Sequence, residues 1–197
     1  MDSQVTLINY TTAQSSEGQV RLLYRRSDPR TAVLLEEGVP RYLLATSDDG
    51  LSKVKIRDMT QRMIAEVNQR MVLSDTVTLP ARNDGKAMKM ADILQKAPTT
   101  SDGQISVKLE TQEGTYHWRM RRAHCWALYT DSPVPIAWTE IVSGSSPTWM
   151  LVVQPRALTL LDYVLASLFY LKAESVRTGA GDGRENMDAR VASLLSR

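Results

Sequence analysis

The chain has 197 residues, a formal net charge of +2 and 43% hydrophobic residues. This length suits one domain, and the apolar fraction allows a sizeable core. The small net charge excludes a strong overall field that would draw the chain to nucleic acid. A single cysteine, Cys125, excludes an internal disulfide. MDSQVTLINY at the start carries no secretory pattern, so we expect a reducing, cytoplasmic compartment.

The chain up to about residue 154 is typical of short strands separated by turns. Alternation of apolar and polar residues predicts strands over 4–10, 19–25, 32–35, 41–46, 53–57, 63–68 and 76–79. KMADILQK at 89–96 lacks alternation and favours a short helix. Further strands are predicted over 105–112, 116–122, 124–130, 136–142 and 148–154, and these contain all four tryptophans. Because large rings pack well on a pleated surface, we expect the aromatic side chains to point inward.

The stretch LTLLDYVLASLFYLKAESVR at 158–177 is apolar on nearly every side. Its uncharged run at 163–171, between Asp162 and Lys172, is shorter than the roughly 20 residues that span a membrane. A helix that is apolar all round and too short to span is usually buried within protein. We therefore predict a helix over about 157–177 that lies inside the fold, with Asp162 and Lys172 marking its two ends.

These elements predict a mainly β fold with one long helix. A helix of this length, about 30 Å, fits inside a β-barrel of about eleven strands. The prediction is a roughly 10–12-stranded antiparallel β-barrel that encloses the apolar C-terminal helix. A sandwich with the helix packed across one open end is the competing geometry. Residues 1–178 would form this single domain, and 179–197, which begin with the Gly-rich GAGDGREN, would form a flexible or weakly helical tail.

Four segments carry a resemblance to a known family. IAEVN (64–68), ADIL (91–94), EGTYHWRM (113–120) and the closing LLDYVLASLFYLKAESVR resemble, in order and spacing, a fungal family of uncharacterised proteins known mainly from mushrooms. The resemblance covers roughly residues 5–178 and departs at Thr115, where the family usually has a basic residue. That family is similar in fold to the tubby C-terminal and LURP-one-related barrels, which are wrapped around an apolar C-terminal helix. The resemblance implies the tubby-like architecture and supplies no activity. Tubby proteins bind phosphoinositides, but their lipid-binding residues find no counterpart in this sequence.

No catalytic constellation is visible. His117 and His124 are the two histidines. His124 and Cys125 are adjacent and so face opposite sides of a strand, which prevents them from binding one metal together. We expect no catalytic residue, no metal and no cofactor. An enzyme or ligand carrier with a pocket at a barrel mouth, using Cys125, His117 or His124, is the alternative, and an assembly protein that associates through its tail is another.

The candidate binding surface is basic. Alternation places three sets of cationic residues on the outward side of their strands: Arg21 and Arg25; Lys53, Lys55 and Arg57; Arg119 and Arg121. If these sets lie close together, they could hold the phosphates of a lipid headgroup through charge-assisted hydrogen bonds. Outward lysine and arginine also serve simply to solvate a sheet. We therefore expect a non-enzymatic binding module, peripheral at a membrane, that engages an anionic phospholipid headgroup or a protein partner through this face, with no nucleic acid and no transmembrane segment.

Overall fold

The structure is a computed structural model that describes residues 18–28, 30–47, 53–70, 73–98, 104–122, 125–142 and 148–177. For Arg122 and residues 175–177 it describes the backbone alone. The strand predicted at 4–10 and the tail predicted at 179–197 lie outside the described residues. The division of the chain at residue 178 therefore stays a prediction.

All strands of the described residues belong to one antiparallel sheet of 13 strands, ordered β7-β6-β5-β4-β3-β2-β1-β13-β12-β11-β10-β9-β8. The strands are β1 (Val20–Arg26), β2 (Thr31–Glu36), β3 (Val39–Thr46), β4 (Lys53–Asp58), β5 (Met63–Asn68), β6 (Thr76–Thr78), β7 (Met88–Lys89), β8 (Leu94–Lys96), β9 (Ser106–Thr111), β10 (Gly114–Arg122), β11 (Cys125–Tyr129), β12 (Ala137–Val142) and β13 (Thr148–Val153). Each strand pairs with the next one along the chain except β7 with β8, and β1 pairs with β13, the last strand of the described residues. The mainly β, antiparallel prediction is confirmed, with one sheet in place of the two of a sandwich.

The sheet is not closed into a barrel. Its two edge strands are β7 and β8, and among the described residues no ladder joins them. The short helix α1 (Met90–Ile93) connects these edges and buries Met90 and Ile93 against the core. The helix predicted over 89–96 is therefore wrong at both ends. Its outer residues pair with backbone on β6 and β9 instead of continuing the helix.

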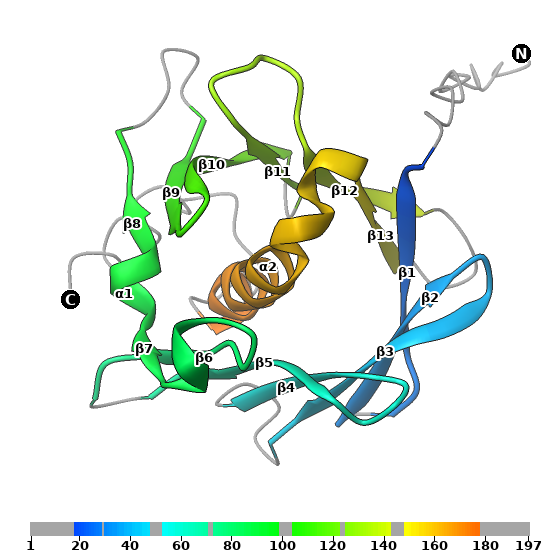
Figure 1. The fold of residues 1–197 in the computed structure, drawn as a ribbon. Coiled ribbons are helices and arrows are strands. Elements are labelled where there is room, and N and C mark those ends of the chain that lie inside the picture. The colour runs from blue at the N-terminus through cyan, green and yellow to red at the C-terminus, as the bar shows by residue number, and fades with distance from the viewer. Residues whose placement is uncertain are drawn as a thin grey trace, which may run out of the picture.

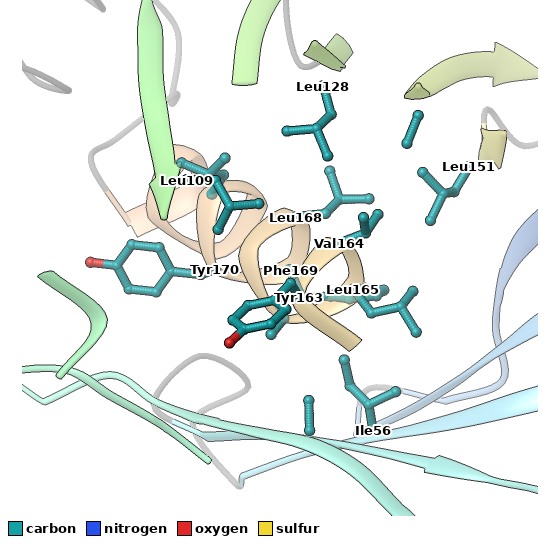
Figure 2. Packing of buried hydrophobic residues seen from close by; sticks show 14 of the residues in the cluster. Ile56, Leu109, Leu128, Leu151, Tyr163, Val164, Leu165, Leu168, Phe169 and Tyr170 are labelled. Atoms are coloured by element: carbon teal, nitrogen blue, oxygen red, sulfur yellow. The ribbon is translucent and has the colours of Figure 1, made fainter. Parts of the chain in front are cut away.

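The C-terminal helix α2 (Leu161–Arg177) lies in the middle of the curved sheet, with strands around it (Figure 1). All residues from 163 to 171 are buried, while Asp162 and Lys172 are half-buried, as predicted. Figure 2 shows the α2 side chains among Ile56, Leu109, Leu128 and Leu151, which come from β4, β9, β11 and β13. Within the described residues, no helix has the length and apolar character that crossing a membrane requires. We call the sheet face that packs on α2 the inner face and the opposite one the outer face.

The first turns of the C-terminal helix are wound more tightly than the predicted α-helix. A 3-10 helix, η2 (Pro155–Leu160), precedes α2, with Pro155 at its beginning. The amide of Ala157 donates to the carbonyl of Gln154 at 2.9 Å, a short-range bond of the 3-10 type. The regular α-helix therefore begins at Leu161 rather than near residue 157.

Polar contacts fix α2 against the inner face. Arg82, in the loop after β6, places its Nε 2.8 Å from Asp162 Oδ2 and also bonds Glu113 and the carbonyl of Thr159. The bond to Asp162, more than the one to Glu113, raises the pKa of Arg82 against the opposing effect of burial. Deeper in the core, Trp118 Nε1 donates to Ser167 Oγ at 2.9 Å. These contacts satisfy buried polar groups that would otherwise destabilise the fold.

At the other end of α2, Lys172 lies beside aromatic rings. Its Nζ is 4.5 Å from the centroid of the Trp149 ring, and Trp149 stacks on Tyr24 with centroids 4.7 Å apart. Burial lowers the pKa of Lys172 to about 8, although the nearby Cys125 opposes this shift. The lysine head therefore lies in surroundings that disfavour its charged form.

Candidate functional site

The predicted basic residues occupy the outer face of the sheet. Leu22 on β1, Ile56 on β4 and Trp118 on β10 belong to the buried core. Because side chains alternate along a strand, the residues beside them point outward. This alternation confirms the predicted outward orientation of six basic residues, which are Arg21, Arg25, Lys53, Lys55, Arg57 and Arg119. The seventh, Arg121, is exposed but lies at an irregularity in the β10–β11 register, where alternation does not assign its side.

The two lysines of β4 are already paired. Lys53 Nζ lies 2.9 Å from Glu66 Oε1, and Lys55 Nζ lies 3.9 Å from Glu66 Oε2. Burial tends to raise the pKa of Glu66, but hydrogen bonds from Lys53 and Asn68 outweigh it and hold the pKa below its ordinary value. One ionised carboxylate thus balances part of the charge of both lysines. This pairing leaves Arg57 as the free cation of the β4 set within the described residues.

The arginines of β1 and β10 fall into one row that crosses five strands. Strand pairing aligns, in order, Arg21, Val152, Trp138, Ala127 and Arg119. Four strand spacings separate Arg21 from Arg119, or about 19 Å between their Cα atoms. We call these five residues the arginine row. It brings two of the three predicted basic sets onto one stretch of the outer face.

Large and small side chains alternate along the arginine row. Val152 and Ala127 are 0% exposed although they face outward, because they lie between the larger members of the row. Arg119 places its guanidinium carbon 4.6 Å from the centroid of the Tyr129 ring. Tyr129 is itself buried on the outer face, outside the core around α2. Arg119 therefore lies flat along the sheet rather than extending into water.

Neither end of the arginine row has a carboxylate partner among the described residues. The Nε atoms of Arg21 and Arg119 are buried there without a hydrogen-bond partner. Glu140, a nearby acid on the same face, accepts a 2.7 Å hydrogen bond from Trp138 Nε1. A buried Nε–H group without an acceptor is unfavourable, and an anionic ligand would relieve that penalty.

The remaining basic residues do not join the arginine row. Arg25 and Arg121 are exposed and lie one to two rows away along their strands. The β4 set is separated from β1 by β2 and β3, which is about 14 Å across the sheet. The seven predicted residues therefore do not form a single patch. They form the arginine row, its exposed neighbours and a separate β4 set.

Two aromatic residues of this face contradict the expectation that aromatic side chains point inward. Trp118 and Trp126 belong to the inner core, but Trp138 and Tyr129 face outward. The signal was present in the sequence: Trp138 alternates with Ala137 and Thr139, which are both buried. Period-two alternation alone would have placed Trp138 outside.

The alternative site built on histidine and cysteine is not assembled by the described residues. His117 lies opposite Tyr129, whereas Cys125 lies opposite Arg122. Four positions of β11 separate the two, or about 13 Å, too far for a nucleophile and its base. His124 lies outside the described residues. Within the part of the chain that the structure describes, no group of three or more potential ligands could hold a metal ion.

Comparisons with known proteins identify no family. No family model matches the sequence, and no curated protein matches it. A crystal structure of a protein from Arabidopsis thaliana is similar over 76% of this chain and 89% of that chain, at 10% sequence identity and a TM-score of 0.43.

Proposed function

We propose that this protein is a non-enzymatic binding module that holds the phosphates of an anionic lipid headgroup on the arginine row. The observation that carries this proposal is the pair of half-buried arginines, Arg21 and Arg119, in register across five strands and without a carboxylate partner among the described residues. Location at a cytoplasmic membrane surface is part of the same proposal.

The chemistry of the row suits phosphate. Arginine presents several donors in a rigid plane that matches phosphate oxygens, and its charge persists at every physiological pH. Arg119 is positioned in advance by Tyr129, so it loses little side-chain entropy on binding. Trp138, between the two arginines, offers an apolar ring of the kind that lies at membrane interfaces.

We further propose that the fold is a tubby-like barrel of the kind found in the mushroom family. Support comes from the 13-stranded antiparallel sheet and from the apolar helix buried within its curve. In this proposal α1 takes the place of a ladder between β7 and β8. The barrel then acts as a rigid scaffold, and its exterior does the binding.

Vesicle co-sedimentation tests the lipid proposal. Vesicles of phosphatidylcholine alone are compared with vesicles that also contain phosphatidylserine or a phosphatidylinositol bisphosphate. We expect the wild-type protein to prefer the anionic vesicles and to lose this preference as salt rises. The double variant Arg21→Gln/Arg119→Gln should bind them about thirtyfold more weakly, since each lost charge near the surface is worth about 1 kcal/mol.

The matched control is Lys53→Gln/Lys55→Gln, which removes the same charge from residues already paired with Glu66. Its binding should stay within about twofold of wild type because paired charges contribute little. Equal binding to neutral and anionic vesicles would contradict the proposal. An equal loss in both double variants would assign the effect to net charge and not to the arginine row.

A further inference from the structure

The outer face of β1–β4 is apolar where a solvated sheet should be polar. Core positions Leu34 and Leu44 alternate with outward Val33, Leu35 and Leu43. Leu23 on β1 pairs with Leu35 and extends the same surface. We call Leu23, Val33, Leu35 and Leu43 the leucine strip. Strands that are apolar on both faces are characteristic of sheets covered on both sides, so the strip is suited to a partner.

An arginine flanks the leucine strip on each side. Strand pairing aligns Arg25, Val33, Leu43 and Arg57 in one row across β1, β2, β3 and β4. Three strand spacings place the Cα atoms of the two arginines about 14 Å apart. An α-helix with its side chains is about 10–12 Å wide. The strip therefore has the width of one helix laid along the strands between the two arginines.

The charges around the leucine strip indicate which sign of charge a partner must carry. Among the described residues, neither Arg25 nor Arg57 has an ion-pair partner, whereas Arg41 pairs with Glu36 at 2.5 Å. Lys53 and Lys55 share Glu66. The unbalanced charges beside the strip are thus both positive, and a helix with acidic flanks complements them.

We propose that the leucine strip docks an acidic amphipathic helix of a partner protein. The apolar side of that helix, with residues at i, i+3, i+4 and i+7, packs on the half-buried Val33 and Leu43, beside Leu35, which is already buried. Its Asp or Glu residues on one flank meet Arg25, and those on the other flank meet Arg57. This is helix-in-groove recognition, with the apolar strip supplying contact area and the arginines supplying orientation.

Charge argues against the protein's own final segment as the occupant. Residues 184–197, RENMDARVASLLSR, combine helical spacing of apolar residues with three arginines against one Glu and one Asp. A basic helix between Arg25 and Arg57 would place like charges together. The proposed surface adjoins the arginine row at Leu23, the next outward position after Arg21 on β1, but includes neither Arg21 nor Arg119.

The test uses the full chain and a designed helical peptide with a leucine stripe and glutamates on both flanks. A matched peptide has lysine in place of each glutamate. Fluorescence anisotropy of the labelled peptides should show at least about tenfold tighter binding of the acidic peptide. The double variant Arg25→Glu/Arg57→Glu should lose about tenfold or more for the acidic peptide. It should gain affinity for the basic one, a reversal that a merely unfolded variant cannot produce.

The control variant Lys86→Glu/Lys89→Glu makes the same change of charge at exposed positions near the sheet edge. It should bind both peptides within about twofold of wild type. Equal affinity for the two peptides, or an equal loss in the control variant, would overturn the proposal.

Two other occupants give different outcomes. If the wild-type chain sediments as a dimer that Val33→Asp converts to a monomer, the strip binds a second copy and the proposal is wrong. If Leu194→Asp/Leu195→Asp increases peptide affinity about tenfold, the chain's own final segment covers the strip, and the proposal is equally wrong. The arginine row is intact in every variant, so failure here leaves the lipid proposal standing.

Discussion

The inner and outer faces of this sheet hold their polar groups in different ways. On the inner face, Ser167 accepts from Trp118, and Arg82 is held by Asp162. On the outer face, Arg21 and Arg119 have buried nitrogen atoms without acceptors among the described residues. These inner contacts stabilise the fold as it stands, although Trp126 Nε1 in the same core has no hydrogen-bond partner among the described residues. The outer arginine groups lack acceptors, and an external anionic ligand can supply them.

The largest effect should come from a cavity on the inner side. Leu165 is 0% exposed within α2, so Leu165→Ala should lower the free energy of unfolding by about 2–5 kcal/mol. Urea denaturation followed by circular dichroism measures this loss. The matched change Leu158→Ala, at a residue 37% exposed in η2, should cost less than about 1 kcal/mol. Comparable losses at both sites would mean that α2 is not the centre of the core.

A smaller inner-face effect should depend on pH. Burial lowers the pKa of Lys172 to about 8 from 10.5. Below pH 8 both the folded and the unfolded chain carry the proton, and the folded state bears the full penalty of burying the charge. Between about 8 and 10.5 the folded state releases the proton while the unfolded state keeps it, so stability rises with pH.

Urea denaturation at pH 7.5 and 9.5 tests this direction. Relative to Lys172→Met, which lacks the titrating group but keeps the apolar stem, wild type should gain about 1–2 kcal/mol between these values. Because Tyr24 is present in both proteins, its raised pKa contributes equally to both curves. Parallel curves for the two proteins would show that Trp149 does not hold a desolvated ammonium.

The smallest effect is expected when the two paired lysines of β4 are freed, so that they resemble the unpaired arginines of the outer face. Glu66→Gln removes the carboxylate that pairs with Lys53 and Lys55, leaving them as free as Arg21. Unfolding free energy should change by less than about 1 kcal/mol because the pairs are partly exposed. Binding to phosphatidylserine vesicles should increase about threefold, and adding Lys53→Gln/Lys55→Gln should cancel the gain. Unchanged binding would mean that unpaired outer cations alone do not attract the membrane.

Sequence periodicity predicted much of the fold and part of the site. Alternation correctly separated inward from outward residues on β1, β4 and β10, and the all-round apolar character of 163–171 predicted a buried helix. Alternation describes one strand at a time, however. That Arg21 shares a row with Arg119 depends on the register of β13, β12 and β11 between them, which no local pattern reports. The same limit hid the pairing of Lys53 and Lys55 with Glu66 on the next strand.

Two further features of the outer face are visible in the sequence. The runs AVLL and YLLA contain apolar residues on both sides of β2 and β3, which indicates a covered outer face. Trp138 lies out of phase with its buried neighbours. In contrast, the exchange of a helix for strand pairing around residues 89–96 could not be predicted locally, because partners on β6 and β9 decide it.

The ladder between β1 and β13 has a consequence for how the molecule is made. During synthesis, β1 leaves the ribosome well before β13 exists. The backbone donors and acceptors of β1 that later pair with β13 are therefore exposed to water until then. The central helix follows β13 and arrives later still. Hairpins such as β2–β3 can form early, but the apolar helix α2 that the sheet surrounds is synthesised after them. Nascent chains should therefore depend on chaperones until α2 has been synthesised.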